Sequence, residues 1–316
     1  MNSDNSLNEP VVVENLTEIT RKIFAKQHRR NIKDDIANAR LKEMGSETFY
    51  NLGDDFFKDK IALDAGCGNT AHLCIQLCKF GVRKVCGFDI GTEWITDAEN
   101  ELKKAGFTNN NFELLPGNIL NIPYQDETFD FVASEGVMCH LADIFEFKQA
   151  FSELTRVLRR GGVLYISVGI GKNSGLLEGI VFPAIREYYK TNEDFKAFVD
   201  NISSNDFECI AQKAIKDMKH FANQEVIYNK ALFDEDLCLT IQDIIQAPSR
   251  INTQYSIEDV ENLFQVHGFQ KIRRLNRYVL RNNIRKYLAP FHYDKTHPFS
   301  KLLYGDGYIE YLGFRN

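Results

Sequence analysis

The sequence predicts an α/β protein with a doubly wound, mostly parallel sheet of seven strands and a helical insertion. Short apolar runs alternate with amphipathic helical patterns between Ile61 and Val168, as in a parallel sheet that carries helices on both faces. The first apolar run, Ile61–Leu63, leads into a glycine-containing turn and then a helical pattern over Ala71–Phe80. A strand, a glycine turn and a helix in this order form a nucleotide-binding unit.

The other elements follow from the same two patterns. Strands are expected at Lys84–Phe88, Asn111–Leu115, Phe129–Ser134 and Val163–Val168, and helices at Thr92–Ala105 and from Phe147 to Leu158. Gly106 and Gly161-Gly162 are expected to end these two helices. Strands near Gln270–Leu280 and Tyr308–Phe314 would complete the sheet, and Ser256 is a plausible N-cap for a helix that ends before Gly268.

The turn after the first strand is predicted to bind an adenosine-containing cofactor. Gly66 and Gly68 let the backbone bend tightly and approach a ligand closely, and Asp89, at the end of the next strand, can accept hydrogen bonds from both ribose hydroxyls. Gly66, Gly68 and Ala71 also fit the dinucleotide fingerprint. Asp64, however, would repel the pyrophosphate of NAD, whereas it favours the cationic ammonium and sulfonium groups of S-adenosylmethionine.

Five ordered motifs resemble those of the class I S-adenosylmethionine-dependent methyltransferases. They are LDAGCG, GFD, PGNI, FDFVASEGVMCHLAD and RVLRRGGVLYIS, which begin at Leu63, Gly87, Pro116, Phe129 and Arg156. The resemblance covers roughly residues 60–168. It implies a Rossmann-like fold whose last strand runs antiparallel, S-adenosyl-L-methionine as the cofactor, and methyl transfer as the reaction. Thr70 replaces the third glycine of the family pattern and is expected to cap the following helix.

The resemblance also implies a set of cofactor contacts. The residues expected to make them are Asp64, Gly66, Cys67, Gly68, Asp89, Ile90, Asn118, Ile119, Ser134 and Glu135. Asp64 would hold the amino group, directly or through a water, and Asp89 the ribose. Asn118 stands where the family usually has Asp, and its side-chain oxygen could accept from the adenine amino group beside the backbone amide of Ile119. The alternative for Asn118 is a plain turn residue.

His140 is the candidate general base. It lies six residues beyond Ser134, and an imidazole with an ordinary pKa of about 6.5 suits proton removal near neutral pH. In the resembled family a histidine near this place often faces the substrate. A partly buried loop histidine is an equally good interpretation. Asp143 could orient His140 or simply cap the next helix.

Four cysteines invite a metal-binding interpretation, but core thiols fit them better. Cys74 and Cys78 are one helical turn apart, whereas Cys67 lies in the cofactor turn and Cys86 in a strand, and the sequence has no CxxC pair. We therefore expect no metal. The seven cysteines, mostly within apolar patterns, favour reduced thiols in the cytoplasm.

Charge and hydropathy restrict the partners. The formal net charge of −6 argues against nucleic acid, because binding a phosphate backbone needs a basic surface. Residues 21–33 and 271–286 are basic stretches without acids; they could line one groove, although solvated faces are the favoured interpretation. No apolar run is as long as a membrane helix, and the first residues lack the pattern of a secretory signal, so no membrane association is expected.

Four segments are expected along the chain. Residues 1–59 would form an N-terminal helical cap, 60–168 the cofactor-binding core, 169–250 a helical insertion or lid, and 251–316 the C-terminal part of the core sheet. Helical spacing covers Val11–Tyr50 in the cap and Leu176–Tyr189, Phe195–Ile202 and Phe207–Phe221 in the insertion. The insertion aromatics Phe182, Tyr188, Tyr189, Phe195 and Phe198 are expected to pack within the lid, with a substrate contact as the alternative.

The leading hypothesis is a methyltransferase of small-molecule biosynthesis that acts on an oxygen or nitrogen of its acceptor, as a monomer or a homodimer. An RNA or protein methyltransferase that uses the two basic stretches is the alternative. An NAD-dependent oxidoreductase and a non-catalytic cofactor-binding protein are more distant alternatives.

Overall fold

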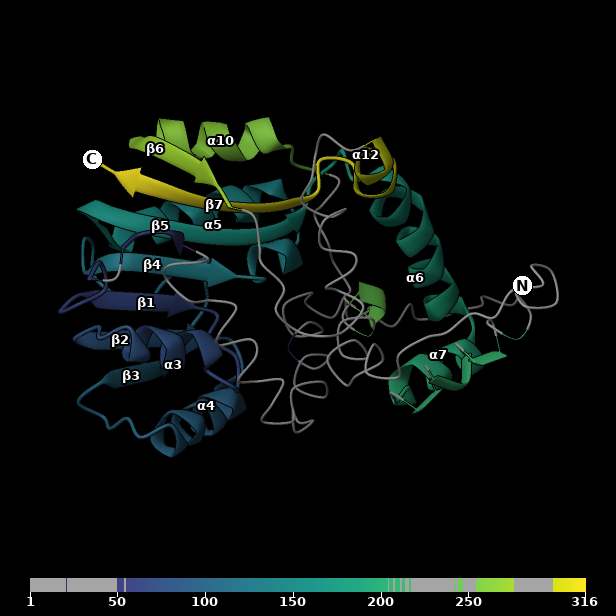
Figure 1. Ribbon diagram of the computed structural model, residues 1–316, viewed down its shortest axis with the longest axis horizontal. Helices are drawn as coiled ribbons and strands as arrows, with labels where there is room; N and C mark the ends of the chain where they lie inside the picture. The colour runs from purple at the N-terminus through teal and green to yellow at the C-terminus, as the bar shows by residue number, and fades with distance from the viewer. Residues whose placement is uncertain are drawn as a thin grey trace, which may run out of the picture.

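A seven-stranded sheet in the order β3-β2-β1-β4-β5-β7-β6 forms the centre of the computed structural model (Figure 1). The structure describes residues 50–53, 55–203, 254–275 and 298–316, with further positions at 21 and between 205 and 246. The strands are β1 (Ile61–Ala65), β2 (Lys84–Asp89), β3 (Phe112–Pro116), β4 (Phe129–Glu135), β5 (Leu158–Ile170), β6 (Phe269–Arg274) and β7 (Tyr308–Arg315). The predicted α/β fold with a sheet of seven strands is confirmed.

The strand order reverses once, between β1 and β4. The chain runs outward from β1 to β3 and then returns to β4 on the other side of β1. Strands β1 to β5 pair in parallel, and β7 runs antiparallel to both β5 and β6, as the resemblance implied. Ligands of such sheets bind beyond the carboxyl ends of the strands at the point of reversal. That point here is the carboxyl edge of β1 and β4.

Helices cover both faces of the sheet, and further helices lie beyond its carboxyl edge (Figure 1). They are α3 (His72–Lys79), α4 (Thr92–Lys104), η2 (Met138–His140), α5 (Ile144–Val157), η3 (Leu177–Val181), α6 (Phe182–Thr191), α7 (Glu193–Asn201), α10 (Ile257–Val266) and α12 (Pro298–Tyr304). Helices α3 and α4 pack on one face, and α5 and α10 on the other, each over its own buried cluster. In β4, Val132 faces α5 while Phe131 and Ala133 face α3, the alternation of a strand that is buried on both sides.

The start of β5 differs from the prediction. Helix α5 ends at Val157, and β5 begins at once with Leu158, which pairs with Phe129 of β4. Gly161 and Gly162 therefore lie inside the strand and do not end the helix. A Cβ at Gly162 would come within 3.0 Å of the backbone oxygen of Asp130, so glycine permits the close approach at this irregular pairing.

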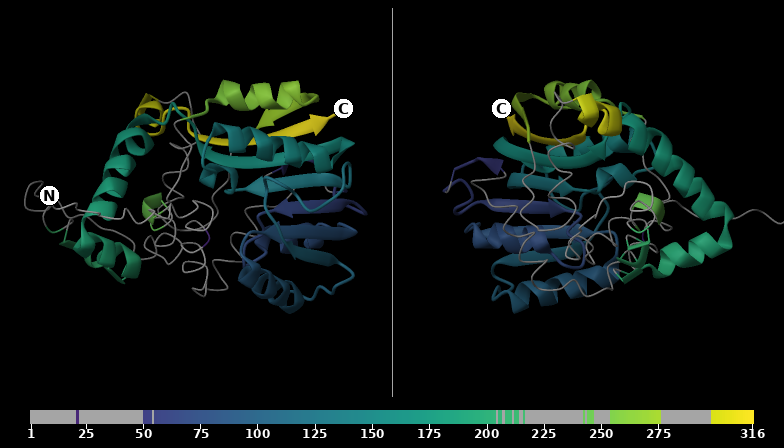
Figure 2. Two further views of the ribbon diagram at one scale, coloured as in Figure 1. Left: turned by 180° about the vertical axis from the view of Figure 1, so that it is seen from behind. Right: turned by 45° about the vertical axis from the view of Figure 1, so that its right-hand side comes forward.

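The described part of the insertion stands beyond the carboxyl ends of the parallel strands (Figures 1 and 2). The predicted helices there are confirmed as η3 with α6 and as α7; the predicted helix over 207–221 lies mostly outside the described residues, as does the predicted N-terminal helix. Tyr189 of α6 donates to Asp200 at 2.7 Å, and Lys196 contacts the same carboxylate at 2.9 Å. The first of these contacts joins α6 to α7 in a hairpin, and the second lies within α7.

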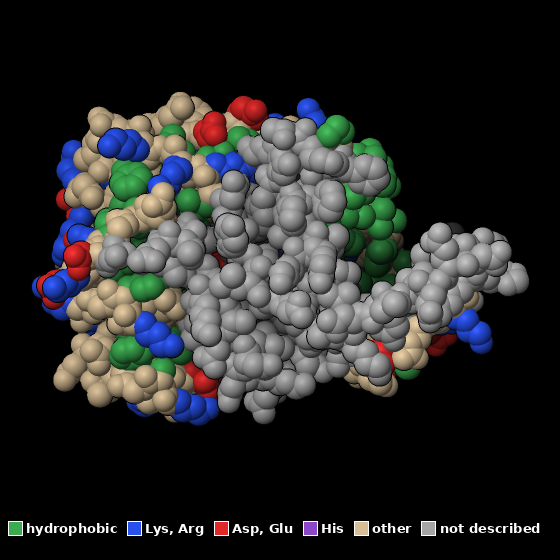
Figure 3. Space-filling model, in the orientation of Figure 1, with side chains coloured by type: hydrophobic (Ala, Val, Ile, Leu, Met, Phe, Trp, Pro, Cys, Tyr) green, Lys and Arg blue, Asp and Glu red, His purple; other side chains and the backbone are tan. Residues whose placement is uncertain are grey.

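Aromatic side chains of this hairpin pack on one another. The ring centroids of Tyr188 and Phe195 are 5.0 Å apart, so packing within the insertion, as predicted, is confirmed for this pair. Hydrophobic side chains gather on the visible surface where α6 lies (Figure 3), and Tyr188 is 53% exposed.

Within the described residues, no helix is long and apolar enough to cross a membrane.

The aromatic cluster under α3 provides a test of the fold. Phe131 is fully buried and packs against Tyr50 and Phe57 with centroid distances of 5.5 and 5.0 Å. We expect Phe131→Ala to lower the free energy of unfolding by about 3–5 kcal/mol, because it leaves a cavity in a close-packed core. Urea denaturation measures this change. Phe145→Ala, at a ring that is 76% exposed, is the control and should change stability by less than about 0.5 kcal/mol; equal losses would contradict the assigned core.

Candidate functional site

Acidic side chains lie at the carboxyl ends of three adjacent strands around the point of reversal. Asp64 is in β1, Asp89 ends β2 and Glu135 ends β4. Side chains alternate along a strand, and Ala62, Val85 and Ala133 belong to the core beneath α3. The three acids therefore lie on this same face of the sheet, at its carboxyl edge.

The glycine turn between β1 and α3 is held by β2. The amides of Gly66 and Cys67 donate to the Phe88 carbonyl oxygen at 2.9 and 3.1 Å. Gly66 has a φ of +101°, and a Cβ there would lie 2.2 Å from Cγ2 of Val137. Only glycine fits this position, as predicted, because both the backbone conformation and the contact exclude a side chain.

Asp89 anchors the turns on both sides of it. One carboxylate oxygen accepts from the amide of Gly68 at 2.9 Å, and the other accepts from the amide of Gly91 at 3.2 Å. Burial raises the pKa of Asp89, although these amides and that of Ile90 oppose the shift. Each oxygen keeps further acceptor capacity, so the carboxylate can also take ribose hydroxyls.

Asp64 is a buried carboxylate whose charge is poorly compensated. It is 3% exposed, and its Oδ2 accepts from the Cys74 thiol at 3.3 Å. Burial raises the pKa of Asp64 to about 7; His72 lowers it, and Glu135 and Asp89 raise it further. A thiol is a weak donor, so a cation beside Asp64 would stabilise its ionised form.

His72 and Glu135 form a pair beside Asp64 that the sequence analysis missed. His72 is the first residue of α3, and its Nε2 lies 3.6 Å from Oε2 of Glu135. The predicted cap at Thr70 is wrong: Ala71, in the left-handed conformation, is the N-cap residue of α3. Thr70 Oγ1 instead lies 3.5 Å from Nδ1 of His72.

The predicted adenine contacts lie after β3. Asn118 Oδ1 accepts from the amide of Leu120 at 2.9 Å, and its backbone oxygen accepts from Asn121 at 3.0 Å. Asn118 therefore forms a turn, which was the alternative interpretation, and its adenine contact stays a prediction. Ile119 is buried.

Ser134 contributes an unsatisfied group at the same edge. Its side chain is fully buried, and its hydroxyl has no hydrogen-bond partner within the described residues. An unpaired buried hydroxyl costs about 1–3 kcal/mol. A polar ligand at the carboxyl end of β4 could supply the partner.

His140 is the last residue of η2, just beyond β4. Asp143 caps α5, since its Oδ1 accepts from the amides of Phe145 and Glu146 at 2.8 and 2.9 Å. The capping interpretation of Asp143 is confirmed, whereas the catalytic role of His140 stays a prediction.

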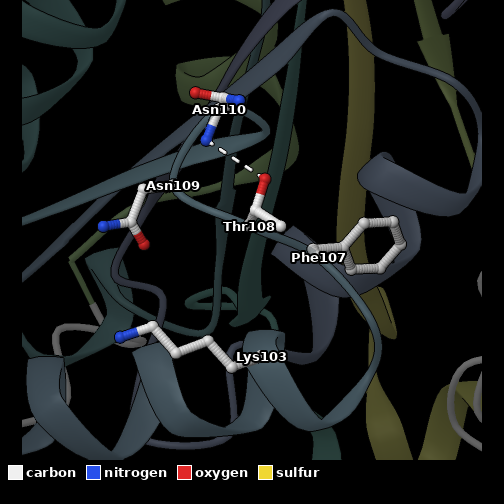
Figure 4. A pocket seen from close by; sticks show the side chains of 5 residues that line it. All are labelled: Lys103, Phe107, Thr108, Asn109 and Asn110. Carbon is white, nitrogen blue, oxygen red and sulfur yellow. Dashed lines mark hydrogen bonds between the residues drawn. The ribbon is translucent and has the colours of Figure 1, made fainter.

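The cysteines and a surface hollow complete the description of this part of the molecule. Cys67, Cys74 and Cys86 are buried, so the prediction of core thiols is confirmed for them. A hollow of about 370 Å³ lies between α4 and β3 and is lined by Lys103, Phe107, Thr108, Asn109 and Asn110 (Figure 4). It lies at the opposite edge of the sheet, where β3 begins.

Residues 56–214 match the family model described as a methyltransferase domain. This match spans half of the chain, and the chain belongs to that family. The resemblance to class I S-adenosylmethionine-dependent methyltransferases is thereby confirmed.

Similarity to individual proteins is partial. The chain is 33% identical over 105 residues to a demethylmenaquinone methyltransferase of Bacillus pumilus, and this alignment covers 33% of this chain and 42% of that protein. It is 34% identical over 108 residues to a tRNA (carboxymethyluridine(34)-5-O)-methyltransferase of Arabidopsis thaliana, and this alignment covers 34% of this chain and 24% of that protein. The matched regions thus span less than half the length of these relatives.

One solved structure that aligns with this chain is that of magnesium protoporphyrin IX methyltransferase from Synechocystis PCC 6803 with bound SAH. It aligns with a TM-score of 0.49 and 13% identity, over 95% of this chain and 94% of that one.

The family uses S-adenosyl-L-methionine as its cofactor, and the residues of this edge fit that molecule. Asp89 offers acceptors for the ribose, and the turn at Gly66 lets a ligand approach the backbone. Asp64 offers a buried carboxylate for the ammonium group. The cofactor supplies an electrophilic methyl group when bound.

The pKa of Asp64 predicts how stability changes with pH. The pKa of Asp64 is about 7 in the folded protein, against an ordinary value of 3.8. The protonated carboxyl group therefore stabilises the folded protein below about pH 3.8, and this contribution is lost as the pH rises to about 7. Relative to Asp64→Asn, the wild type should lose roughly 2–4 kcal/mol of unfolding free energy between about pH 4 and about pH 8.

Urea denaturation of both proteins across this pH range measures the difference. Asp97→Asn, at an exposed carboxylate of α4, is the matched control. Parallel curves for the wild type and Asp64→Asn would show that the Asp64 pKa is not raised.

Proposed function

We propose that the protein transfers the methyl group of S-adenosyl-L-methionine to an oxygen or nitrogen of a small-molecule acceptor. The observation that carries this proposal is the row of carboxylates at the carboxyl edge, beside a glycine turn that Asp89 holds in place. Such a row matches a cationic cofactor and not an anionic dinucleotide. An oxidoreductase that uses NAD would place its pyrophosphate against Asp64.

The acidic row continues past the cofactor residues, which supports a small acceptor. Glu135 pairs in register with Ser167 of β5, and Ser167 pairs with Glu310 of β7. Ser167 donates to Glu310 at 3.2 Å, and both side chains are fully buried. Glu135, whose side chain is 18% exposed, would repel a polyanionic RNA when ionised but not a small neutral or cationic molecule.

The described part of the second basic stretch does not offer its arginines freely. Arg273 donates to the backbone oxygens of Tyr50 and Asn51, and Arg274 donates to that of Asp306 at 2.6 Å. These guanidinium groups connect β6 to residues 50 and 51 and to the residue two positions before β7. The rest of that stretch, and of the stretch at 21–33 apart from Arg21, lies outside the described residues.

Methyl transfer needs alignment more than covalent chemistry from the protein. Asp89 would fix the ribose and Asp64 the ammonium group, which together set the direction of the reactive S–CH3 bond. His140, just beyond the end of β4, is the candidate base that removes the proton from the acceptor.

The flanking segments would exclude water and shape the acceptor site. Arg21 of the N-terminal segment contacts Glu93 of α4 at 2.7 Å, close in sequence to Asp89. The α6–α7 hairpin lies beyond the carboxyl edge of the sheet, where Asp89 ends β2 (Figure 1). We infer that these two segments form the cap and the lid over the cofactor.

We also infer that the protein acts in the cytoplasm, where its buried thiols stay reduced.

Calorimetric titration tests the cofactor proposal. We expect the wild type to bind S-adenosylmethionine and S-adenosylhomocysteine but not NAD. Asp89→Ala should weaken both adenosyl ligands at least roughly tenfold, because it removes charge-assisted hydrogen bonds. Asp97→Ala serves as the matched control and should bind normally. A wild type that binds neither adenosyl ligand would refute the proposal.

Transfer of a tritiated methyl group tests the acceptor class. We expect label from S-adenosylmethionine to enter the small-molecule fraction of a cell extract and not its RNA or protein fractions. His140→Gln should lower the rate by about 10²–10⁴-fold if His140 is the base, with cofactor affinity unchanged. Label in RNA would instead favour the RNA-directed alternative.

A further inference from the structure

Two carboxylates and one imidazole meet at the carboxyl ends of β1 and β4. His72 Nε2 lies 3.6 Å from Glu135 Oε2, and His72 acts electrostatically on Asp64, whose pKa it lowers. Asp64 is buried, while the side chains of His72 and Glu135 are 31% and 18% exposed. The imidazole is therefore partly exposed, and it lies at the edge at which Asp64 is expected to bind the cofactor.

The charges of this trio match those of an α-amino acid. The methionine end of S-adenosylmethionine carries an ammonium and a carboxylate on one carbon atom, so its binding site needs an acceptor group and a donor group side by side. Asp64 and Glu135 can take the ammonium, and both are hydrogen-bond acceptors when ionised. The carboxylate then needs a donor near them, and an imidazole N–H is such a donor.

The position of His72 at the start of α3 favours an anion, whereas Asp64 and Glu135 disfavour one until a cation neutralises them. His72 is the first residue of α3, and the first turn of that helix has no acidic residue. Unpaired amides at a helix N-terminus attract negative charge. Thr70 Oγ1, 3.5 Å from Nδ1, restricts the orientation of the ring.

We propose that His72 binds the α-carboxylate of the cofactor's methionine end, while Asp64 and Glu135 hold its ammonium group. Arrival of the ammonium gives Glu135 a new cationic partner, which frees the His72 N–H to donate to the carboxylate. This assignment rests on the proposed function and adds to it a residue that selects the amino-acid end of the ligand.

A pair of ligands that differ only in the carboxylate tests the assignment. Calorimetry would compare S-adenosylmethionine with decarboxylated S-adenosylmethionine, for wild type, His72→Ala and His72→Gln. We expect His72→Ala to weaken S-adenosylmethionine by roughly 10- to 100-fold, the effect of a hydrogen bond to a charged group, and to change the decarboxylated ligand less than threefold. His72→Gln keeps an N–H donor and should recover most of the lost affinity.

Controls separate this assignment from the proposed function. His267→Ala removes an imidazole that contacts Ser152 at 3.0 Å near the far end of α10, and it should bind both ligands as the wild type does. Thermal melting of each variant confirms that it is folded. Equal weakening of both ligands by His72→Ala would overturn the assignment alone. Failure of the wild type to bind either ligand would overturn the proposed function, and the assignment with it.

Discussion

The carboxylate of Asp89 holds the candidate site in shape. It accepts from the amide of Gly68 at 2.9 Å and from that of Gly91 at 3.2 Å, so one side chain at the end of β2 fixes the turn after β1 and the turn before α4. Both turns border the edge where the cofactor is proposed to bind. A buried acid with backbone donors on each oxygen is rigid, because leaving either amide unpaired would cost free energy.

Asp64 has the opposite character. It is buried at the end of β1 with a weak thiol donor from Cys74, and burial raises its pKa to about 7. The fold therefore tolerates this acid at a cost in stability that a bound cation would offset. Asp89 shapes the site, whereas Asp64 gives it a preference for positive charge. The division follows from the different partners of the two acids, which lie one strand apart.

Local sequence patterns predicted the sheet because each strand and helix has its own signal. Apolar runs located β1 to β4, and Ser256, predicted as an N-cap, forms a capping box with Asp259 at the start of α10. The start of β5 was missed because Leu158 belongs to the strand only through its pairing with Phe129. Tertiary pairing decided that boundary over the helical periodicity.

The candidate site was predicted less completely than the sheet. Asp64, Gly66 and Asp89 follow from short motifs, since a turn and the ends of its flanking strands are local. His72 was missed because its partner Glu135 is far along the chain, and only the β1–β4 pairing brings the two together. Thr70 was misjudged because the conformation of Ala71, not a side-chain cap, starts α3.

A crystal structure of the complex with S-adenosylhomocysteine would show directly where the cofactor binds. We expect the ribose hydroxyls to contact the Asp89 carboxylate and the amino group to lie against Asp64, at the carboxyl ends of β1 and β2. A ligand bound elsewhere, for example in the hollow between α4 and β3, or a ribose that does not contact Asp89, would contradict this expectation.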